Sequence, residues 1–203
     1  MILLQLEAEG KLSINDPLGK WLPQYPAWRH VTIRQLLNMT SGIADYAFEP
    51  GFVAAIAADP STHFSAARLV SYAVGVPLGP AGWAYSDTNY ILAQMIIQRV
   101  THRSYAEQLT NRIIRPLGLR AMCHAPYTCP AADAVRMPAG YFYMPGAPSL
   151  LGRPMPRLAL TWAQGAGGIV SSLRDMTIWD RALYQGRNCR PASSASSRAW
   201  YPR

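Results

Sequence analysis

Tyr85 and Asp87 are the residues whose types and spacing are best suited to chemistry. They lie in residues 85–90, Tyr-Ser-Asp-Thr-Asn-Tyr, shortly after a Pro-Ala-Gly-Trp turn at residues 80–83. A tyrosine at a turn before a helix can be held rigidly with its hydroxyl towards a cleft. If a nearby cation lowers its pKa, the phenolate can act as a general base. Packing is the competing interpretation, because a tyrosine at the start of a helix is more often structural.

Other arrangements that activate a nucleophile do not occur in the sequence. Gly-x-Ser-x-Gly, Ser-x-x-Lys, Lys-Thr-Gly and His-Thr-Gly are absent, and neither Lys11 nor Lys20 has a serine three residues before it. Ser41, in Thr-Ser-Gly, is the serine that most invites a catalytic interpretation. The sequence places no lysine or histidine to activate it, so we expect a structural role at a helix end.

The histidines and cysteines show no metal-binding pattern. They are His30, His63, His102, His124, Cys123, Cys129 and Cys189. Each histidine is expected to be an ordinary surface or core residue, and no Cys-x-x-Cys spacing occurs. Cys123 and Cys129 could pair in an oxidising compartment, although free thiols are the favoured interpretation. We expect no metal and no cofactor.

Composition excludes several classes of protein. The chain has 203 residues, is 50% hydrophobic and contains 17 prolines and 15 glycines, which indicates a globular domain, or a large part of one, with many turns. The net charge of +8 comes mostly from arginine, without a clustered basic face or a nucleic-acid-binding module, so no nucleic-acid partner is expected. No apolar run reaches the ~18 residues of a membrane span. The first residues do not form a signal peptide, so the sequence as given is expected to be cytoplasmic.

The hydrophobic pattern predicts a helix-rich chain that holds the Tyr85 segment in place. Capping boxes are expected at Ser104 with Glu107 and, with aspartate replacing glutamate, at Ser172 with Asp175. Residues 125–160 are expected to form loop with short strands. The predicted helices cover residues 1–9, 33–39 (capped by Thr32), 51–58, 64–74, 88–101, 104–115 and a last helix from Ser172 to near Gly186.

Residues 85–90 resemble the Tyr-x-Asn segment of class C β-lactamases, D-alanyl-D-alanine carboxypeptidases and related esterases, which commonly reads Tyr-Ser-Asn-Thr-Asn-Tyr. Further pieces are similar to the same family in the same order. They are Leu-Glu-Ala-Glu-Gly-Lys-Leu-Ser-Ile-Asn-Asp-Pro (6–17), the Leu-Leu to Thr-Ser-Gly segment (31–43), Ile-Ile-Arg-Pro-Leu-Gly-Leu (113–119) and Gly-Gly-Ile-Val-Ser-Ser-Leu-Arg-Asp (167–175). The resemblance covers residues 1–186.

The resemblance implies a serine hydrolase that cleaves amide or ester bonds through an acyl-enzyme. In such a site a serine attacks, a lysine one helical turn later assists, and a Lys/His-x-Gly strand completes the pocket. Tyr85 would be the proton shuttle, and Asp87 stands where the family has a substrate-orienting asparagine. An ionised aspartate only accepts hydrogen bonds, and its charge disfavours a tyrosinate nearby.

The resemblance also implies an α+β fold of the β-lactamase/penicillin-binding transpeptidase type. This chain would be mostly its helical subdomain, with much of the sheet missing. We expect helices 88–101 and 104–115 to need that sheet, so the isolated chain would expose a large apolar patch. Residues 1–186 would be a partial domain, and residues 187–203 an aberrant or disordered tail from a possible frameshift.

With no Ser-x-x-Lys or Lys/His-x-Gly motif, this chain is expected to be inactive alone, with the nucleophile upstream and the third motif downstream. The alternative is a non-catalytic binding protein, or a pseudogene product, of the same fold. An unrelated enzyme using Asp87 and Asp175 is disfavoured, because nothing in the sequence puts the two carboxylates in one cleft. Lactam, ester and D-amino-acid peptide substrates stay open, within a small-molecule or peptidoglycan-like class, as does the oligomeric state. The full-length parent would be periplasmic or secreted.

Overall fold

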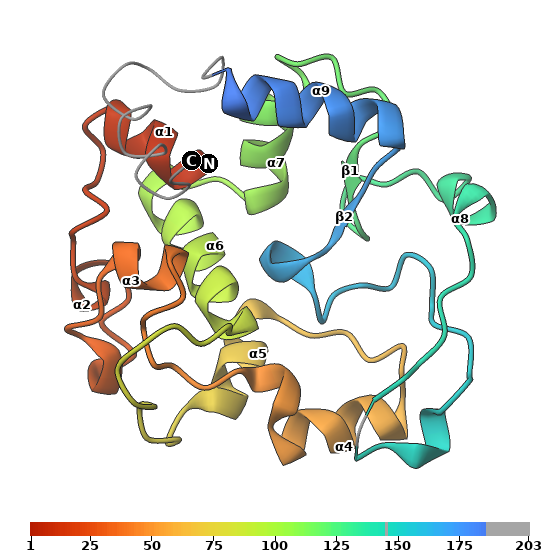
Figure 1. Cartoon of the computed structure of the whole chain (residues 1–203), viewed down its shortest axis with the longest axis horizontal. Coiled ribbons are helices and arrows are strands. Elements are labelled where there is room, and N and C mark those ends of the chain that lie inside the picture. Colours follow the sequence, from red (N-terminus) through yellow and green to blue (C-terminus); the bar gives the residue numbers. More distant parts are fainter. Residues whose placement is uncertain (145, 186–203) are drawn as a thin grey trace.

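A fifteen-residue helix, α6 (Asp87–Thr101), runs through the middle of the structure (Figure 1). The computed structural model describes residues 1–144 and 146–185. Ile91, Leu92 and Ile96 on α6 are completely shielded from solvent, because helices from both earlier and later parts of the chain pack around them. Burial of these apolar side chains is the main favourable term that fixes the position of α6.

The other elements are short, and most are helical. In chain order, before α6, they are α1 (Ile2–Ala8), α2 (Leu18–Trp21), η1 (Pro26–Trp28), α3 (Ile33–Leu37), η2 (Tyr46–Phe48), α4 (Pro50–Ala58) and α5 (Ala66–Ala73). After α6 they are α7 (Tyr105–Leu109), the π-helical turn η3 (Thr110–Ile114), β1 (Cys123–His124), α8 (Asp133–Arg136), η4 (Pro148–Leu150), η5 (Gln164–Ala166), β2 (Ile169–Val170) and α9 (Leu173–Tyr184). The named strands of the described residues form one antiparallel pair, in which Cys123 lies opposite Val170.

The predicted helix at the N-terminus is confirmed and is held by ion pairs. Gly10, with φ of 70°, adopts the left-handed conformation that ends α1. The Arg112 guanidinium reaches back to Glu9 with Nη1–Oε1 and Nη2–Oε2 distances of 2.5 and 3.0 Å. This contact lowers the pKa of Glu9 to about 2 and ties α1 to η3.

Two predicted helix starts are confirmed in detail, and one predicted helix end is wrong. Thr32 with Gln35, and Ser104 with Glu107, each form a complete capping box. The helix that begins after Thr32 was expected to reach Met39, but it ends at Leu37. Met39 has a positive φ of 61°, which an α-helix cannot accommodate.

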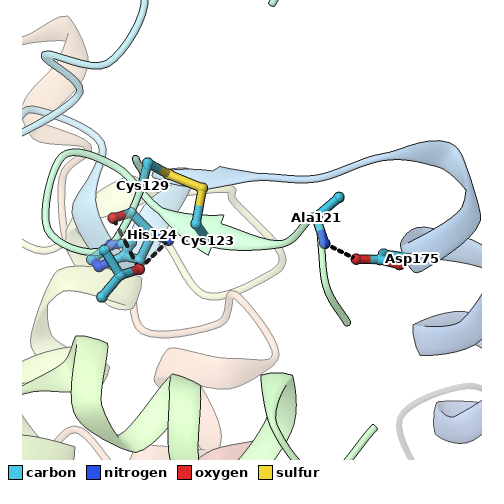
Figure 2. Close-up of a disulfide and its surroundings, with 6 residues drawn as sticks. Ala121, Cys123, His124, Cys129 and Asp175 are labelled. Atoms are coloured by element: carbon cyan, nitrogen blue, oxygen red, sulfur yellow. Dashed lines mark hydrogen bonds between the residues drawn. A yellow bond between two sulfur atoms is a disulfide. The ribbon is translucent and has the colours of Figure 1, made fainter. Parts of the chain in front are cut away.

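The capping box predicted at Ser172 is only half formed. The Ser172 hydroxyl accepts from the Asp175 backbone amide at 3.2 Å. The Asp175 carboxylate instead accepts from the backbone amide of Ala121 at 2.6 Å, as Figure 2 shows. The side chain, only 4% exposed, therefore ties the first turn of α9 to the segment before β1.

Cys123 and Cys129 form a disulfide, so the expectation of free thiols was wrong for this pair. The loop after β1 folds back on itself, because the Thr128 backbone amide donates to the His124 carbonyl at 2.8 Å. The His124 amide donates to the Thr128 hydroxyl, also at 2.8 Å, within the same loop (Figure 2). These bonds bring the two cysteine Cα atoms to 5.0 Å, within the usual range for a disulfide.

The expectation that helices 88–101 and 104–115 depend on an absent sheet was wrong for their main apolar residues. Ile91, Leu92 and Ile96 of α6 are buried against other helices, and Leu109 and Ile113 are at most 5% exposed. Residues 125–160 are mostly loop, as predicted, but the short strands expected there are wrong: the described part of this stretch contains the short helices α8 and η4 and an isolated β-bridge between Tyr141 and Pro154. The predicted tail at residues 187–203 lies outside the described residues.

Removing the Asp175 carboxylate is expected to destabilise the chain. Asp175→Ala leaves the Ala121 amide without its acceptor, which should lower the free energy of unfolding by about 1–3 kcal/mol. Urea unfolding followed by circular dichroism measures this change. Asp180→Ala is the matched control, because Asp180 is an exposed aspartate on the same helix. Equal effects of the two substitutions would contradict the role given to Asp175.

Candidate active site

The structure brings Tyr85 and Asp87 into direct contact at the start of α6. The Tyr85 hydroxyl donates to Oδ1 of Asp87 at 2.9 Å. The Tyr85 side chain is 49% exposed, and Asp87 is partly buried as the first residue of α6. A half-exposed phenol and a carboxyl therefore form a pair that a ligand can approach from solvent.

Hydrogen bonds between α6 and the segment before η2 fix the position of this pair. The Thr88 hydroxyl accepts from the Tyr46 backbone amide at 3.0 Å and donates to the Ala44 carbonyl at 2.7 Å. The Ser86 hydroxyl donates to the same carbonyl at 3.2 Å. Because Thr88 is fully buried and Ser86 is 1% exposed, water does not compete for these bonds. The backbone on both sides of Asp87 is thus held in place.

Ser41 and Asn89 form a second buried contact behind the pair. The Ser41 hydroxyl donates to Oδ1 of Asn89 at 2.7 Å and accepts from the Ile43 amide at 3.1 Å. Ser41 is 7% exposed and Asn89 is fully buried. The geometry agrees with the structural role expected for Ser41. Asn89 is therefore committed to a buried contact. Asp87, two residues after Tyr85, is the more accessible of the two side chains.

The electrostatics oppose ionisation of the phenol. Burial, the hydrogen bond to Asp87 and the negative charge of Asp87 all raise the pKa of Tyr85 well above its usual range. Among residues 1–144 and 146–185 every charged group that shifts this pKa raises it, so the described part of the chain does not supply the cation that would activate Tyr85. The expected effect of the Asp87 charge on the phenol is confirmed. In this arrangement Tyr85 is a neutral hydroxyl that donates to Asp87.

Burial also raises the pKa of Asp87, and the nearby charge of Asp45 adds to the effect. Asp45 is the residue that sequence reasoning missed. It lies just before η2, where its Oδ1 accepts from the Ala47 backbone amide at 3.0 Å. Asp45 lies three residues after Gly42 of the Thr-Ser-Gly segment, which marks it only as part of a segment similar to the family. Nothing in the sequence showed that this segment packs on α6.

An apolar cavity of about 450 Å³ runs along α6 beyond the pair. Tyr90 is one of its lining residues, and the Tyr90 ring centroid is 6.3 Å from that of Tyr85. Residues from α1, α3, α7, β2 and α9 line the rest of it. They include Leu3, Leu37, Ile97, Leu109, Ile169 and Trp179. Tyr85 and Asp87 are not among the lining residues, so Tyr90 is the contact between the pair and this mostly apolar cavity.

The remaining candidate residues do not join this site. His124 is buried between the rings of Tyr105 and Tyr127, and burial lowers its pKa, so it is a core histidine as expected. Asp175 is occupied by the Ala121 amide near β1. Among residues 1–144 and 146–185, no group of three or more His, Cys, Asp or Glu side chains lies together as metal ligands would.

Comparison with known proteins decides the family. The sequence model of the Beta-lactamase family matches residues 1–202. The chain belongs to the β-lactamase family. This confirms both the resemblance and the expected fold class, in which the described part is mainly helical with one small sheet.

Several relatives are similar over much of the chain. A D-stereospecific amidohydrolase from Streptomyces sp. has 32% sequence identity and a TM-score of 0.76, with 96% of this chain and 60% of that chain covered. The D-amino acid amidase from Ochrobactrum anthropi SV3, solved with D-phenylalanine, has 26% identity and a TM-score of 0.76, with 95% and 55% covered. The teichoic acid D-alanine hydrolase of Staphylococcus aureus (strain MRSA252) is 29% identical over 59% of this chain and 28% of its own length. The chain spans about half the length of the family members it matches.

Replacing Asp87 by asparagine is expected to stabilise the chain at neutral pH. The pKa of Asp87 is raised in the folded state, so keeping this carboxyl ionised costs folding free energy above that pKa. Asparagine removes the cost. The gain should shrink as the pH falls through the pKa of Asp87 and vanish when both folded and unfolded carboxyls are protonated, below about pH 3.9. Urea unfolding of both proteins at a series of pH values measures the difference.

Asp133→Asn is the matched control, because Asp133 also lies in the first turn of a helix, α8. A lower stability of Asp87→Asn at pH 7 would contradict the electrostatic account. It would mean that the attraction between the carboxylate and the N-terminal dipole of α6 outweighs burial and the charge of Asp45.

Proposed function

We propose that this chain supplies the proton-transfer part of a serine hydrolase that cleaves amide or ester bonds through an acyl-enzyme. The observation that carries the proposal is the Tyr85–Asp87 pair, held at the start of α6 in a chain of the β-lactamase family. By itself a tyrosine–aspartate pair has many structural uses. Its solvent-accessible position in the family's Tyr-x-Asn segment favours the catalytic one.

The reaction follows the chemistry implied by the family. A serine outside this sequence, assisted by its lysine, attacks the substrate carbonyl. Its proton passes through the Tyr85 hydroxyl to the leaving amine or alcohol as the acyl bond breaks. Water then attacks the acyl-enzyme, loses its proton along the reverse route and releases the acid and the free serine. The raised pKa of Tyr85 fits a relay that passes a proton on, rather than a standing phenolate.

Asp87 would orient the substrate and tune Tyr85. When ionised, it can only accept hydrogen bonds, and it holds the Tyr85 hydroxyl at 2.9 Å. A substrate amide N–H could then compete with Tyr85 for the same carboxylate. When protonated, Asp87 can also donate to a carbonyl, as the amide of an asparagine does. The protonation state of this side chain therefore decides which part of the substrate it can bind.

D-amino-acid amides and esters are the substrates that we favour within the small-molecule and peptidoglycan-like class. The support is the similarity to a D-stereospecific amidohydrolase, a D-amino acid amidase and a teichoic acid D-alanine hydrolase. These relatives share the family chemistry and act on substrates containing D-configured residues, according to their names. Lactams fit the same chemistry, since they too are attacked at an amide carbonyl.

We further propose that residues 1–203 alone are inactive, because no Ser-x-x-Lys motif occurs among them. The Cys123–Cys129 disulfide supports an oxidising compartment, such as the periplasm or the cell exterior, for the whole protein. Among the described residues no helix has both the length and the apolar character needed to cross a bilayer.

A non-catalytic binding protein of the same fold is the second candidate. The observation that favours it is Asp87 at the asparagine position, since its charge opposes ionisation of Tyr85. A longer protein that binds a D-amino-acid amide without turning it over, although it contains the serine and lysine, would favour this candidate over the hydrolase.

In a protein that carries the flanking family segments, Tyr85→Phe should lower the acylation rate by about 100-fold or more, the usual contribution of a positioned acid–base group. Asp87→Asn should raise the rate, because it removes a negative charge beside Tyr85 and adds a donor. Stopped-flow acylation with a chromogenic D-amino-acid ester measures both. If Asp87→Asn abolished activity while Tyr85→Phe left it intact, Asp87 would be the working base instead.

A further inference from the structure

We propose that His124 is an acid-sensitive latch behind the wall of the apolar cavity: its neutral ring holds α7 and the turn between η5 and β2 together, and its protonated ring releases them. The latch is the imidazole of His124, which belongs to the loop closed by the Cys123–Cys129 disulfide (Figure 2). Its release is a change in conformation, so it does not depend on the proposed hydrolase function.

Two aromatic rings enclose the His124 side chain, which is only 1% exposed. The Tyr127 ring, from the loop after β1, stacks on it with a centroid distance of 5.1 Å and an angle of 26° between the planes. The Tyr105 ring, from α7, meets it at 84°, also with a centroid distance of 5.1 Å. Among the described residues neither ring nitrogen of His124 has a hydrogen-bond partner. Packing therefore holds the ring, and burial without such a partner favours its uncharged form.

The turn between η5 and β2 also approaches the ring. A Cβ atom placed on Gly168 would lie 3.1 Å from Nε2 of His124 and 2.9 Å from the Gln164 carbonyl oxygen, so a larger residue would push the turn away. The Ala125 amide, directly after His124 in the chain, donates to the Gly168 carbonyl at 2.7 Å. His124 therefore lies where the disulfide loop, α7 and this turn meet.

These contacts connect the latch to the cavity of about 450 Å³. Tyr105, which touches the ring of His124, is one of the lining residues of the cavity. Gly167 and Ile169, the two neighbours of Gly168, line it as well. His124 itself does not line the cavity, so it supports two parts of the wall from behind. Movement of the ring out of this place would loosen both parts.

Protonation is the event that releases the ring. Burial lowers the pKa of His124, and the Gln164 carbonyl, which lies near the ring outside hydrogen-bond geometry, opposes this only in part. The titratable groups that face the ring are the phenols of Tyr105 and Tyr127. No charged side chain of the described residues shifts the pKa of His124.

The direction of the pH effect follows from this lowered pKa. In an opened loop the ring regains its ordinary pKa of about 6.5. As the pH falls below that value, the opened form gains a proton that the closed form does not bind. The closed latch therefore loses stability as the pH falls, until the pH has passed the lowered pKa of the buried ring.

Two NMR measurements on the whole 203-residue chain test the latch. In a titration of the histidine rings, His124 should protonate at lower pH than the exposed His63. Amide hydrogen exchange follows the bond from Ala125 to Gly168. After correction for the intrinsic effect of pH on exchange, the protection of the Ala125 amide should fall by up to about tenfold per pH unit below the ordinary histidine pKa, because opening is linked to one proton.

His124→Phe is the decisive variant, because phenylalanine keeps an aromatic ring in place and cannot be protonated. In this variant the protection of the Ala125 amide should not change between about pH 7 and pH 5, the range in which an ordinary histidine titrates. His63→Phe is the matched control and should keep the pH dependence of the unmodified chain.

Three outcomes would overturn the proposal. They are titration of His124 and His63 at the same pH, constant protection of Ala125 in the unmodified chain over this range, and a pH dependence that persists in folded His124→Phe. The first two are measured on the unmodified chain, so they do not require any variant to fold.

Discussion

The buried polar junction between the Ser41–Tyr46 segment and the first turns of α6 is the constraint on which the candidate site depends. Ser41 and Asn89 join side chain to side chain at 2.7 Å, and Thr88 joins the backbone at Tyr46 and Ala44. Ser41, Thr88 and Asn89 are at most 7% exposed. An unpaired polar group at this depth is costly, so each bond enforces the others and α6 has one position relative to the segment. Because Tyr85 and Asp87 lie at the start of α6, the same bonds fix where they lie.

Hydrophobic packing and this junction act on different parts of the same helix. Ile91, Leu92 and Ile96 bury the middle of α6 and supply most of the free energy that holds the helix in the core. The hydrogen-bonded end fixes its position where the chain meets solvent. This arrangement has an energetic cost, because it places the carboxyls of Asp45 and Asp87 where burial disfavours their ionised forms and raises the pKa of each. Carboxyls with raised pKa values are common at functional sites, so their presence here is consistent with function.

Local patterns could be predicted from the sequence, because they depend on near neighbours. The helix over residues 88–101 follows from its apolar run, and the caps at Thr32 and Ser104 follow from residues three positions away. Contacts between distant segments could not be predicted. Asp175 was assigned to its own helix, yet it accepts from Ala121, and nothing local indicates that the Tyr46 backbone bonds to Thr88. The prediction of free thiols at Cys123 and Cys129 was wrong for a related reason. The spacing of the two cysteines alone does not show that the loop between them closes.

Covalent labelling tests the central claim that Ser41, whose hydroxyl donates to Asn89 behind the candidate site, is a structural residue and not the nucleophile. The chain is incubated with a fluorescent penicillin and, separately, with a fluorescent fluorophosphonate, and then separated by denaturing electrophoresis. The account predicts no specific label on either sample, because the Ser41 hydroxyl is committed to Asn89 and has no lysine or histidine beside it in the sequence. A specific label that disappears when Ser41 is replaced by alanine would contradict it.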